Sequence, residues 1–119
     1  MGPWYVNVLL GNLGTSPATP GALGAFLALM PPECVFAVAG IGRLQTAANL
    51  LGIASGGHVR VGLEDNIWWD HDRTTLATNA QLVERVRRMA DIAERPIATR
   101  AETRAALGLA QPARVAQVV

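Results

Sequence analysis

Three residues near the middle of the chain are of types that support acid–base or metal chemistry. Arg60 is followed four positions later by Glu64 and then directly by Asp65. A carboxylate can accept a proton or bind a divalent cation, and an arginine can hold an anionic substrate in a fixed orientation. The three residues therefore form a candidate site for moving a proton on an anionic substrate.

The same residues also admit a purely structural explanation. Acidic residues are common in the turns that follow strands, where one of them can cap the turn. Arg60 would then only form an ion pair with Glu64 or Asp65. The placement of the charges alone favours neither explanation.

A predicted strand over residues 58–63 must position these side chains. Successive side chains of a strand point to opposite faces, so one face of this strand is apolar. The other face carries His58, Arg60, Gly62 and Glu64. Because the other predicted strands are apolar on both faces, we expect the polar face to point into an enclosed interior, such as that of a barrel. Barrel active sites lie at the carboxyl ends of the strands, where Glu64 and Asp65 fall.

The rest of the chain alternates predicted strands and helices. Runs of bulky apolar residues indicate strands, whereas N-caps, capping boxes and terminal glycines or prolines indicate helices. The predicted strands span Trp4–Leu10, Cys34–Ala39 and His58–Leu63. The predicted helices span Pro20–Met30, Arg43–Ala54, Asn79–Glu94 with a Thr78–Gln81 capping box, and a short segment from a Thr99–Glu102 capping box to Gly108. The long connections favour parallel strands covered by helices, so the predicted fold class is α/β.

Composition narrows the possible classes of protein. The 119 residues are 50% hydrophobic and 16% charged, as expected for one globular domain. A net charge of +1 with mixed signs argues against nucleic acid or an anionic membrane as a partner. The single cysteine, Cys34, excludes an internal disulfide and suits a reducing cytosol. No apolar run reaches the about 20 residues needed to cross a bilayer, and no secretory leader is evident, so we expect a cytoplasmic protein.

The segment Gly56–Asn66, Gly-Gly-His-Val-Arg-Val-Gly-Leu-Glu-Asp-Asn, resembles the signature of the β-keto acid cleavage enzymes, a family that includes the 3-keto-5-aminohexanoate cleavage enzyme. Two further segments, Ala39–Gln45 and Ala77–Arg85, are similar to the end of that family's preceding strand and the start of its last barrel helix. The resemblance implies a partial (β/α)8 TIM barrel, consisting of the last three βα units with parallel strands. We therefore expect residues 1–109 to form this part of the barrel and residues 110–119 to form a flexible tail.

The resemblance also implies an activity and roles for the candidate residues. Members of the family are zinc-dependent enzymes that convert a β-keto acid and acetyl-CoA into acetoacetate and a new CoA thioester. By this resemblance Glu64 is the carboxylate ligand of the zinc ion, and Asp65 and Arg60 are the catalytic pair for proton transfer and substrate orientation. A Lewis acid that polarises a keto oxygen, with an acid–base pair beside it, suits this chemistry.

The zinc site is expected to be incomplete in this chain. The family's other ligands are two histidines in a His-x-His arrangement, and the sequence has only His58 and His71. His58 would lie roughly 20 Å from Glu64 along a strand, too far to share an ion, and we predict a hydrogen-bonded histidine of the barrel floor. For His71 we predict a solvated loop. Catalysis would then require the missing N-terminal half-barrel as a partner.

Four further residues are predicted to contact substrate or CoA: Gly11, Gly14, Gln45 and Asn66. The two glycines lie in a loop whose backbone amides could hold a phosphate. The Trp68–Trp69 pair is predicted to pack beneath its loop, and the alternative is that it lines the mouth of a substrate pocket. The alternative function is a noncatalytic module that self-associates through its open sheet edges.

Overall fold

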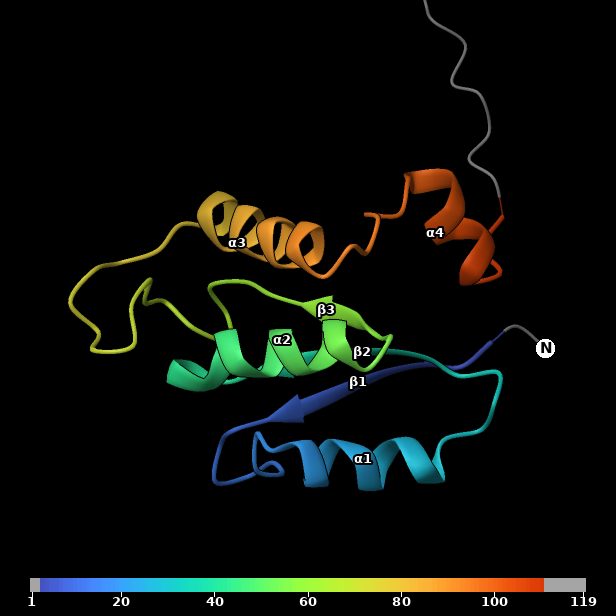
Figure 1. Cartoon of the computed structure of the whole chain (residues 1–119), viewed down its shortest axis with the longest axis horizontal. Coiled ribbons are helices and arrows are strands. Elements are labelled where there is room, and N and C mark those ends of the chain that lie inside the picture. The colour runs from blue at the N-terminus through green and yellow to red at the C-terminus, as the bar shows by residue number, and fades with distance from the viewer. Residues whose placement is uncertain (1–2, 111–119) are drawn as a thin grey trace, which may run out of the picture.

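The computed structural model describes residues 3–110 and has a three-stranded parallel sheet with helices between and after the strands (Figure 1). In order across the sheet, the strands are β1 (Tyr5–Leu10), β2 (Val35–Gly40) and β3 (His58–Arg60). The helices are α1 (Pro20–Leu29), the 3-10 helix η1 (Gly42–Leu44), α2 (Gln45–Ala54), α3 (Asn79–Ile92) and α4 (Arg100–Ala106). The α/β class and the parallel strands are confirmed. Of the predicted tail, 110–119, residues 111–119 lie outside the described residues.

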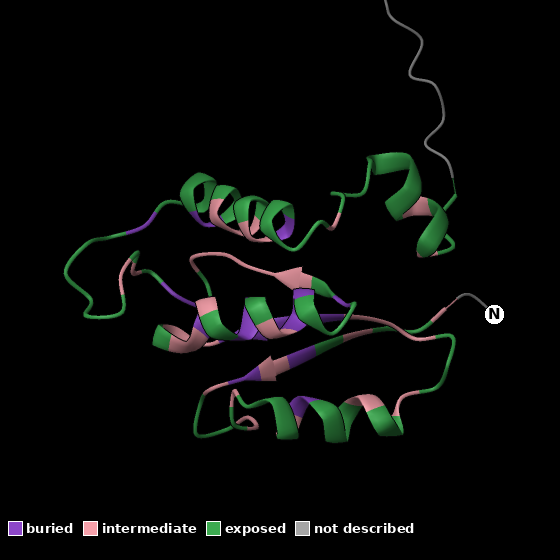
Figure 2. Ribbon diagram, viewed as in Figure 1, coloured by how far each residue is buried: buried purple, intermediate pink, exposed green. Residues whose placement is uncertain are grey.

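One face of the sheet forms the core with α1 and α2. Buried Val8 and Leu10 of β1 and Val38 of β2 pack with Leu23 of α1 and Ala48 of α2. Figure 2 shows that this burial is concentrated on β2, the central strand. Strand alternation directs the remaining side chains of the sheet, including that of Arg60, to the opposite face.

The ends of the helices follow local sequence signals. Both predicted capping boxes are present, Thr78 with Gln81 on α3 and Thr99 with Glu102 on α4. Gly108 ends α4 with a positive φ of 63°, which glycine adopts without steric cost. Among residues 3–110, no helix is both long enough and apolar enough to span a membrane.

The third strand is shorter than predicted. It ends at Arg60 rather than Leu63, because the Gly62 carbonyl accepts hydrogen bonds from the amides of Asp65 and Asn66, both at 3.2 Å. The chain therefore turns where the alternating pattern was expected to continue. The prediction that Gly62 and Glu64 lie on one strand face with Arg60 is wrong, since both belong to this turn.

The first strand is less buried than predicted. Trp4 is 60% exposed and Tyr5 49% exposed, although this segment was expected to be covered on both faces. In the part of the chain that the structure describes, β1 and β3 each have only β2 as a neighbour, so both outer edges of the sheet are unpaired. Unpaired edges with apolar side chains nearby are surfaces on which another strand can pair.

Candidate active site at the carboxyl end of β3

Arg60, Glu64 and Asp65 converge where β3 ends. The Nη2 atom of Arg60 lies 3.1 Å from Oε2 of Glu64 and 3.1 Å from Oδ1 of Asp65. The side chain of Asp65 is 6% exposed and that of Glu64 is 85% exposed. The site thus combines a buried carboxylate and an exposed carboxylate with one guanidinium between them, which suits a fixed proton acceptor next to a carboxylate that can bind a ligand.

This geometry combines elements of both sequence-based explanations. The structural explanation expected Arg60 to pair with Glu64 or with Asp65, and in the structure it pairs with both. The turn, however, is fixed by other groups: the amide of Leu63 donates to Oδ1 of Asn79 at 3.0 Å, and the amide of Gly42 donates to the carbonyl of Asp65 at 2.8 Å. Among the described residues, the two carboxylates therefore bond to Arg60 and not to the backbone of the turn. Their roles as metal ligand and proton acceptor stay predictions.

Two amide side chains of α2 hold the ends of the strands. Asn49 donates to the carbonyls of Val38 at 3.5 Å and Arg60 at 3.2 Å, and Gln45 donates to the carbonyl of Gly62 at 3.1 Å. Both side chains are almost fully buried. Sequence reasoning missed Asn49, although its spacing of four from Gln45 places both on one side of the helix.

Gln45 and Asn66 were predicted to contact substrate or CoA. Gln45 is buried, and its Oε1 has no hydrogen-bond partner among the described residues. Asn66 uses both ends of its amide on the backbone of Trp68, donating to the carbonyl at 2.7 Å and accepting from the amide at 3.2 Å. In this structure both side chains support the turn, and their contact with a ligand stays a prediction.

A cavity of about 250 Å³ lies beside the two carboxylates. Its lining includes Glu64, Asp65, Asn66, Gly42 and Arg73. Arg73 comes from the loop that precedes α3, and sequence reasoning missed it because nothing local links it to the strand end. Its guanidinium is the one basic group among the described residues of this lining, beside the carboxylates of Glu64 and Asp65, and can bind the carboxylate of a ligand.

The loop with Gly11 and Gly14 uses most of its amides internally. The amide of Gly11 donates to the carbonyl of Ser16 at 2.8 Å, and those of Asn12 and Thr15 bond within the loop at 2.9 and 3.0 Å. Gly11 has a φ of 92°, and a Cβ there would lie 2.9 Å from Cβ of Leu44. The predicted phosphate contact of this loop stays a prediction.

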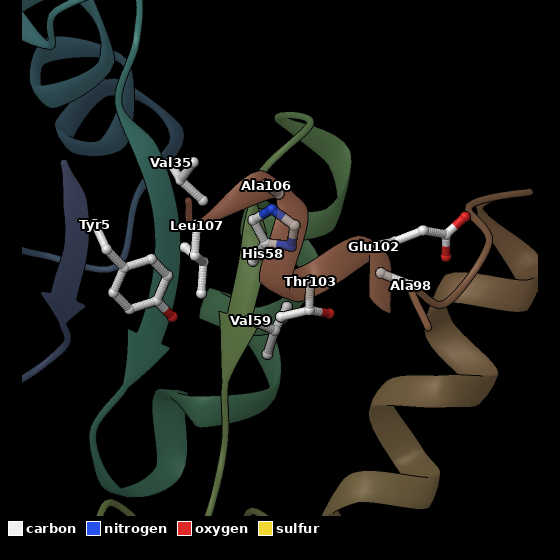
Figure 3. Close-up of a pocket in the computed structure, with 9 residues that line it drawn as sticks. All are labelled: Tyr5, Val35, His58, Val59, Ala98, Glu102, Thr103, Ala106 and Leu107. Atoms are coloured by element: carbon white, nitrogen blue, oxygen red, sulfur yellow. The ribbon is translucent and has the colours of Figure 1, made fainter. Parts of the chain in front are cut away.

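The two histidines lie away from the carboxylates. His58 begins β3 at the opposite end of the sheet, where it lines a cavity of about 320 Å³ next to α4 (Figure 3). The residue is exposed, so the predicted enclosed position on a barrel floor is not seen. His71 is a solvated loop residue, as predicted, with its side chain 68% exposed. Within residues 3–110, no group of three His, Cys, Asp or Glu residues could hold a metal ion.

The two tryptophans of the loop after β3 differ in their exposure to solvent. Trp68 is partly buried, whereas Trp69 is somewhat more exposed. The guanidinium of Arg85 lies 4.5 Å from the centre of a Trp69 ring, and its Nη1 donates to the carbonyl of Trp69 at 2.7 Å. Burial lowers the pKa of Arg85 from its ordinary value. The ring of Trp69 is therefore packed against α3 on one side, in part as predicted.

Comparison with known proteins gives the family. The model of the beta-keto acid cleavage enzyme matches residues 1–109. The chain is 38% identical over 109 residues to the 3-keto-5-aminohexanoate cleavage enzyme of Acetoanaerobium sticklandii. This alignment covers 92% of this chain and 40% of that protein. It is 34% identical over 111 residues to the 3-oxoadipate:acetyl-CoA acetyltransferase of Cupriavidus necator. That alignment covers 91% of this chain and 39% of the relative.

A third relative, a 3-keto-5-aminohexanoate cleavage enzyme of Fusobacterium nucleatum, is 47% identical over 81 residues, or 67% of this chain and 29% of that protein. The chain thus spans at most about two fifths of the length of these curated relatives. The match of the family model to nearly all described residues confirms the resemblance seen in the sequence. The chain belongs to the β-keto acid cleavage enzyme family.

Proposed function

We propose that this chain supplies the carboxyl-terminal part of an active site that converts a β-keto acid and acetyl-CoA into acetoacetate and a new acyl-CoA. The names of two relatives, a keto acid cleavage enzyme and an acetyl-CoA acetyltransferase, support this reaction. The observation that carries the proposal is the position of Arg60, 3.1 Å from both Glu64 and Asp65 at the end of β3. Its three βα units would be the last three of a (β/α)8 barrel, whose active site lies at that end of the strands. The free thiol of Cys34 suits action in the cytoplasm.

In this proposal Asp65 accepts a proton and Arg60 orients the substrate. Formation of acetoacetate requires a carbanion next to a carbonyl group, and a positioned carboxylate can accept the proton that leaves. Asp65 is suited to this because its side chain is buried, bonded to Arg60, and fixed through its own carbonyl by the amide of Gly42. Arg60 and Arg73 provide the positive charge that would hold the carboxylate of the keto acid.

The donor set fits one ligand of the zinc ion that the family implies. Glu64 presents an exposed carboxylate beside the cavity, and carboxylate oxygens are established zinc ligands. The remaining ligands, which by the family resemblance are two histidines, would come from the partner polypeptide that supplies the first five βα units. When bound, the ion would act as a Lewis acid toward the keto oxygen.

Reconstitution tests this function directly. The chain is mixed with a polypeptide that supplies the first five βα units of a family member, and acyl-CoA formation from acetyl-CoA is measured with zinc present. We expect turnover in the mixture and none from either part alone. Asp65→Asn and Arg60→Met should each lower turnover by about 10²- to 10⁴-fold. Arg87→Gln, at an exposed position of α3, is the matched control and should leave turnover unchanged. Association of the two parts without turnover would remove the proposal.

The second candidate is a noncatalytic module that self-associates. The exposed Trp4 and Tyr5 beside the unpaired edge of β1 favour it, because apolar residues at a free edge promote strand pairing between molecules. Light scattering should then show an oligomer that grows with concentration, and Tyr5→Lys should reduce it. A monomer that melts cooperatively would contradict this candidate.

A further inference from the structure

A third cavity, of about 550 Å³, lies along α2 and α3 next to the loop that joins β3 to α3. In Figure 1 this loop extends past the N-terminal end of α2 before the chain enters α3. Two other cavities are lined by the edge strand β3, whose outer edge has no neighbouring strand among the described residues. This cavity is instead formed by two helices that contact each other and by a hydrogen-bonded loop. It is therefore formed entirely by elements of this chain.

The walls of this cavity have two different chemical characters. One part is apolar, with Ala47 and Leu50 of α2 and the ring of Trp69. Another part is polar and basic, with Arg43, Thr46 and His71. An aromatic base packs on surfaces of the first kind, and phosphate groups bind to side chains of the second kind.

We propose that this cavity binds the 3′-phosphorylated adenosine diphosphate end of coenzyme A. The identity of the ligand rests on the proposed function, in which acetyl-CoA is the co-substrate. The adenine ring lies against Trp69 and Leu50, and the phosphates lie near Arg43 and His71. The volume suits a single nucleotide, since ligand pockets are commonly about 300 to 1,000 Å³.

The aromatic wall is fixed before any ligand arrives. Arg85 stacks on Trp69 at 4.5 Å and donates to its carbonyl at 2.7 Å, and the amide of Trp69 donates to the carbonyl of Thr75 at 2.8 Å. A side chain held in this way loses little conformational freedom on binding, which favours affinity.

The charges around the cavity also favour an anionic ligand. Arg43 is exposed and forms no ion pair within residues 3–110. The one acidic residue of the lining, Asp70, accepts hydrogen bonds from the amides of Thr74 and Thr75 at 2.7 to 3.2 Å, so its carboxylate is already bonded to the loop. In (β/α)8 barrels, phosphate sites are frequent at the loops after the last two strands and at a short extra helix, positions that correspond here to η1 and the loop after β3.

The cavity adjoins the candidate active site. Asn66 lines both this cavity and the smaller one beside Asp65. A CoA molecule bound by its nucleotide end could therefore extend its thioester toward Arg60 and Asp65. In this arrangement Asn66 lies between the two parts of the ligand while its amide supports the turn.

Binding of adenosine 3′,5′-bisphosphate to the full chain, measured by isothermal titration calorimetry, tests the inference. We expect Trp69→Leu to weaken binding by about tenfold, as for loss of one base-stacking ring. Arg43→Gln should weaken it by about tenfold and reduce its salt dependence. Arg87→Gln removes the same charge from the exposed surface of α3 and should leave binding unchanged. CoA should bind as the bisphosphate does, whereas AMP, which lacks the 3′-phosphate, should bind more weakly.

Three results would overturn the inference: no binding to a folded chain, equal loss with the Arg87 variant, or binding unaffected by both site variants. Circular dichroism melts of each variant separate lost binding from lost folding. The assay requires no turnover, so its outcome is independent of the reconstitution experiment. Turnover without bisphosphate binding would reject this site and leave the proposed function standing. Bisphosphate binding without turnover would support this site and reject the proposed function.

Discussion

The two ends of the sheet differ in how completely this chain organises them. At the carboxyl end, the backbone around Arg60 and the turn after it is hydrogen-bonded to α2, η1 and α3 through Asn49, Gln45, Gly42 and Asn79. At the amino end, Tyr5 and His58 are exposed, and a cavity separates them from α4 (Figure 3). The chain therefore fixes the geometry of its candidate site by itself, while its amino end has apolar surface open to a further partner.

The largest effect is expected where β2 meets α2, at Gly40. A Cβ at this position would lie 2.5 Å from Cα of Gln45 and 2.7 Å from Cβ of Ala48, so backbone must move. Gly40→Ala should lower the free energy of unfolding by about 3 kcal/mol. Gly24→Ala in α1, where nothing lies within 4 Å, should raise it by about 0.5 to 1 kcal/mol. Urea melts measure both, and equal effects would show that the carboxyl end is not closely packed.

A pair of substitutions compares the two ends directly. Asn49→Leu leaves the carbonyls of Val38 and Arg60 without their side-chain donor and should cost about 2 kcal/mol. At the amino end, Arg95 donates to the carbonyls of Ile53, Gly56 and Gly57 at 2.8 to 3.2 Å, and Arg95→Met should cost about 1 to 2 kcal/mol because that site is partly solvated.

Amide hydrogen exchange distinguishes the two substitutions. Asn49→Leu should speed exchange at Asp65 and Asn66, whose amides close the turn after β3. Arg95→Met should speed exchange at Gly56 and Gly57, whose amides donate to the carbonyls of Ile53 and Gly52 in the last turn of α2. If each variant affected both ends equally, the two ends would form one cooperative unit rather than two.

The sequence was sufficient for features set by neighbours in the chain. Strand positions, capping boxes and glycine-terminated helices depend on residues a few positions apart, and they were predicted to within two residues, apart from the end of β3. That end depends on Asn79, which lies 16 residues beyond Leu63, and on the amide of Gly42. Alternation along the strand contains no information about such contacts, so the turn was predicted as strand.

The candidate site was predicted in part for the same reason. Arg60, Glu64 and Asp65 are close in sequence, and the structure brings them together. The contribution of Arg73 requires the fold of the loop before α3, and the buried position of Gln45 requires the packing of α2 on the sheet. The ligand contact of Gln45 stays a prediction, and its buried position and its bond to the carbonyl of Gly62 make it a support of the turn.

A smaller effect is expected at the end of α3, which leads to the amino end of the sheet. Glu94 follows this helix with a φ of 53°, in the left-handed region that disfavours residues with a Cβ. Glu94→Gly should raise the free energy of unfolding by about 1 kcal/mol. Glu33→Gly, which lies in a loop without positive φ, is the control and should not stabilise. A destabilising Glu94→Gly would mean that the side chain contributes more than its backbone strain costs.

The smallest effect is expected from the protonation of Asp70, in the loop that carries Trp69, at low pH. The backbone amide of Thr74, opposed by burial and assisted by the amide of Thr75, lowers the pKa of Asp70 from 3.8 to about 2. Because the folded pKa is below the unfolded one, the stabilisation is present above pH 3.8 and is lost as the pH falls through about 2. NMR signals of the Thr74 and Thr75 amides should therefore titrate with a midpoint near pH 2. Asp70→Asn should abolish this titration, and a midpoint near 3.8 in the unaltered chain would show that the carboxylate does not hold the loop.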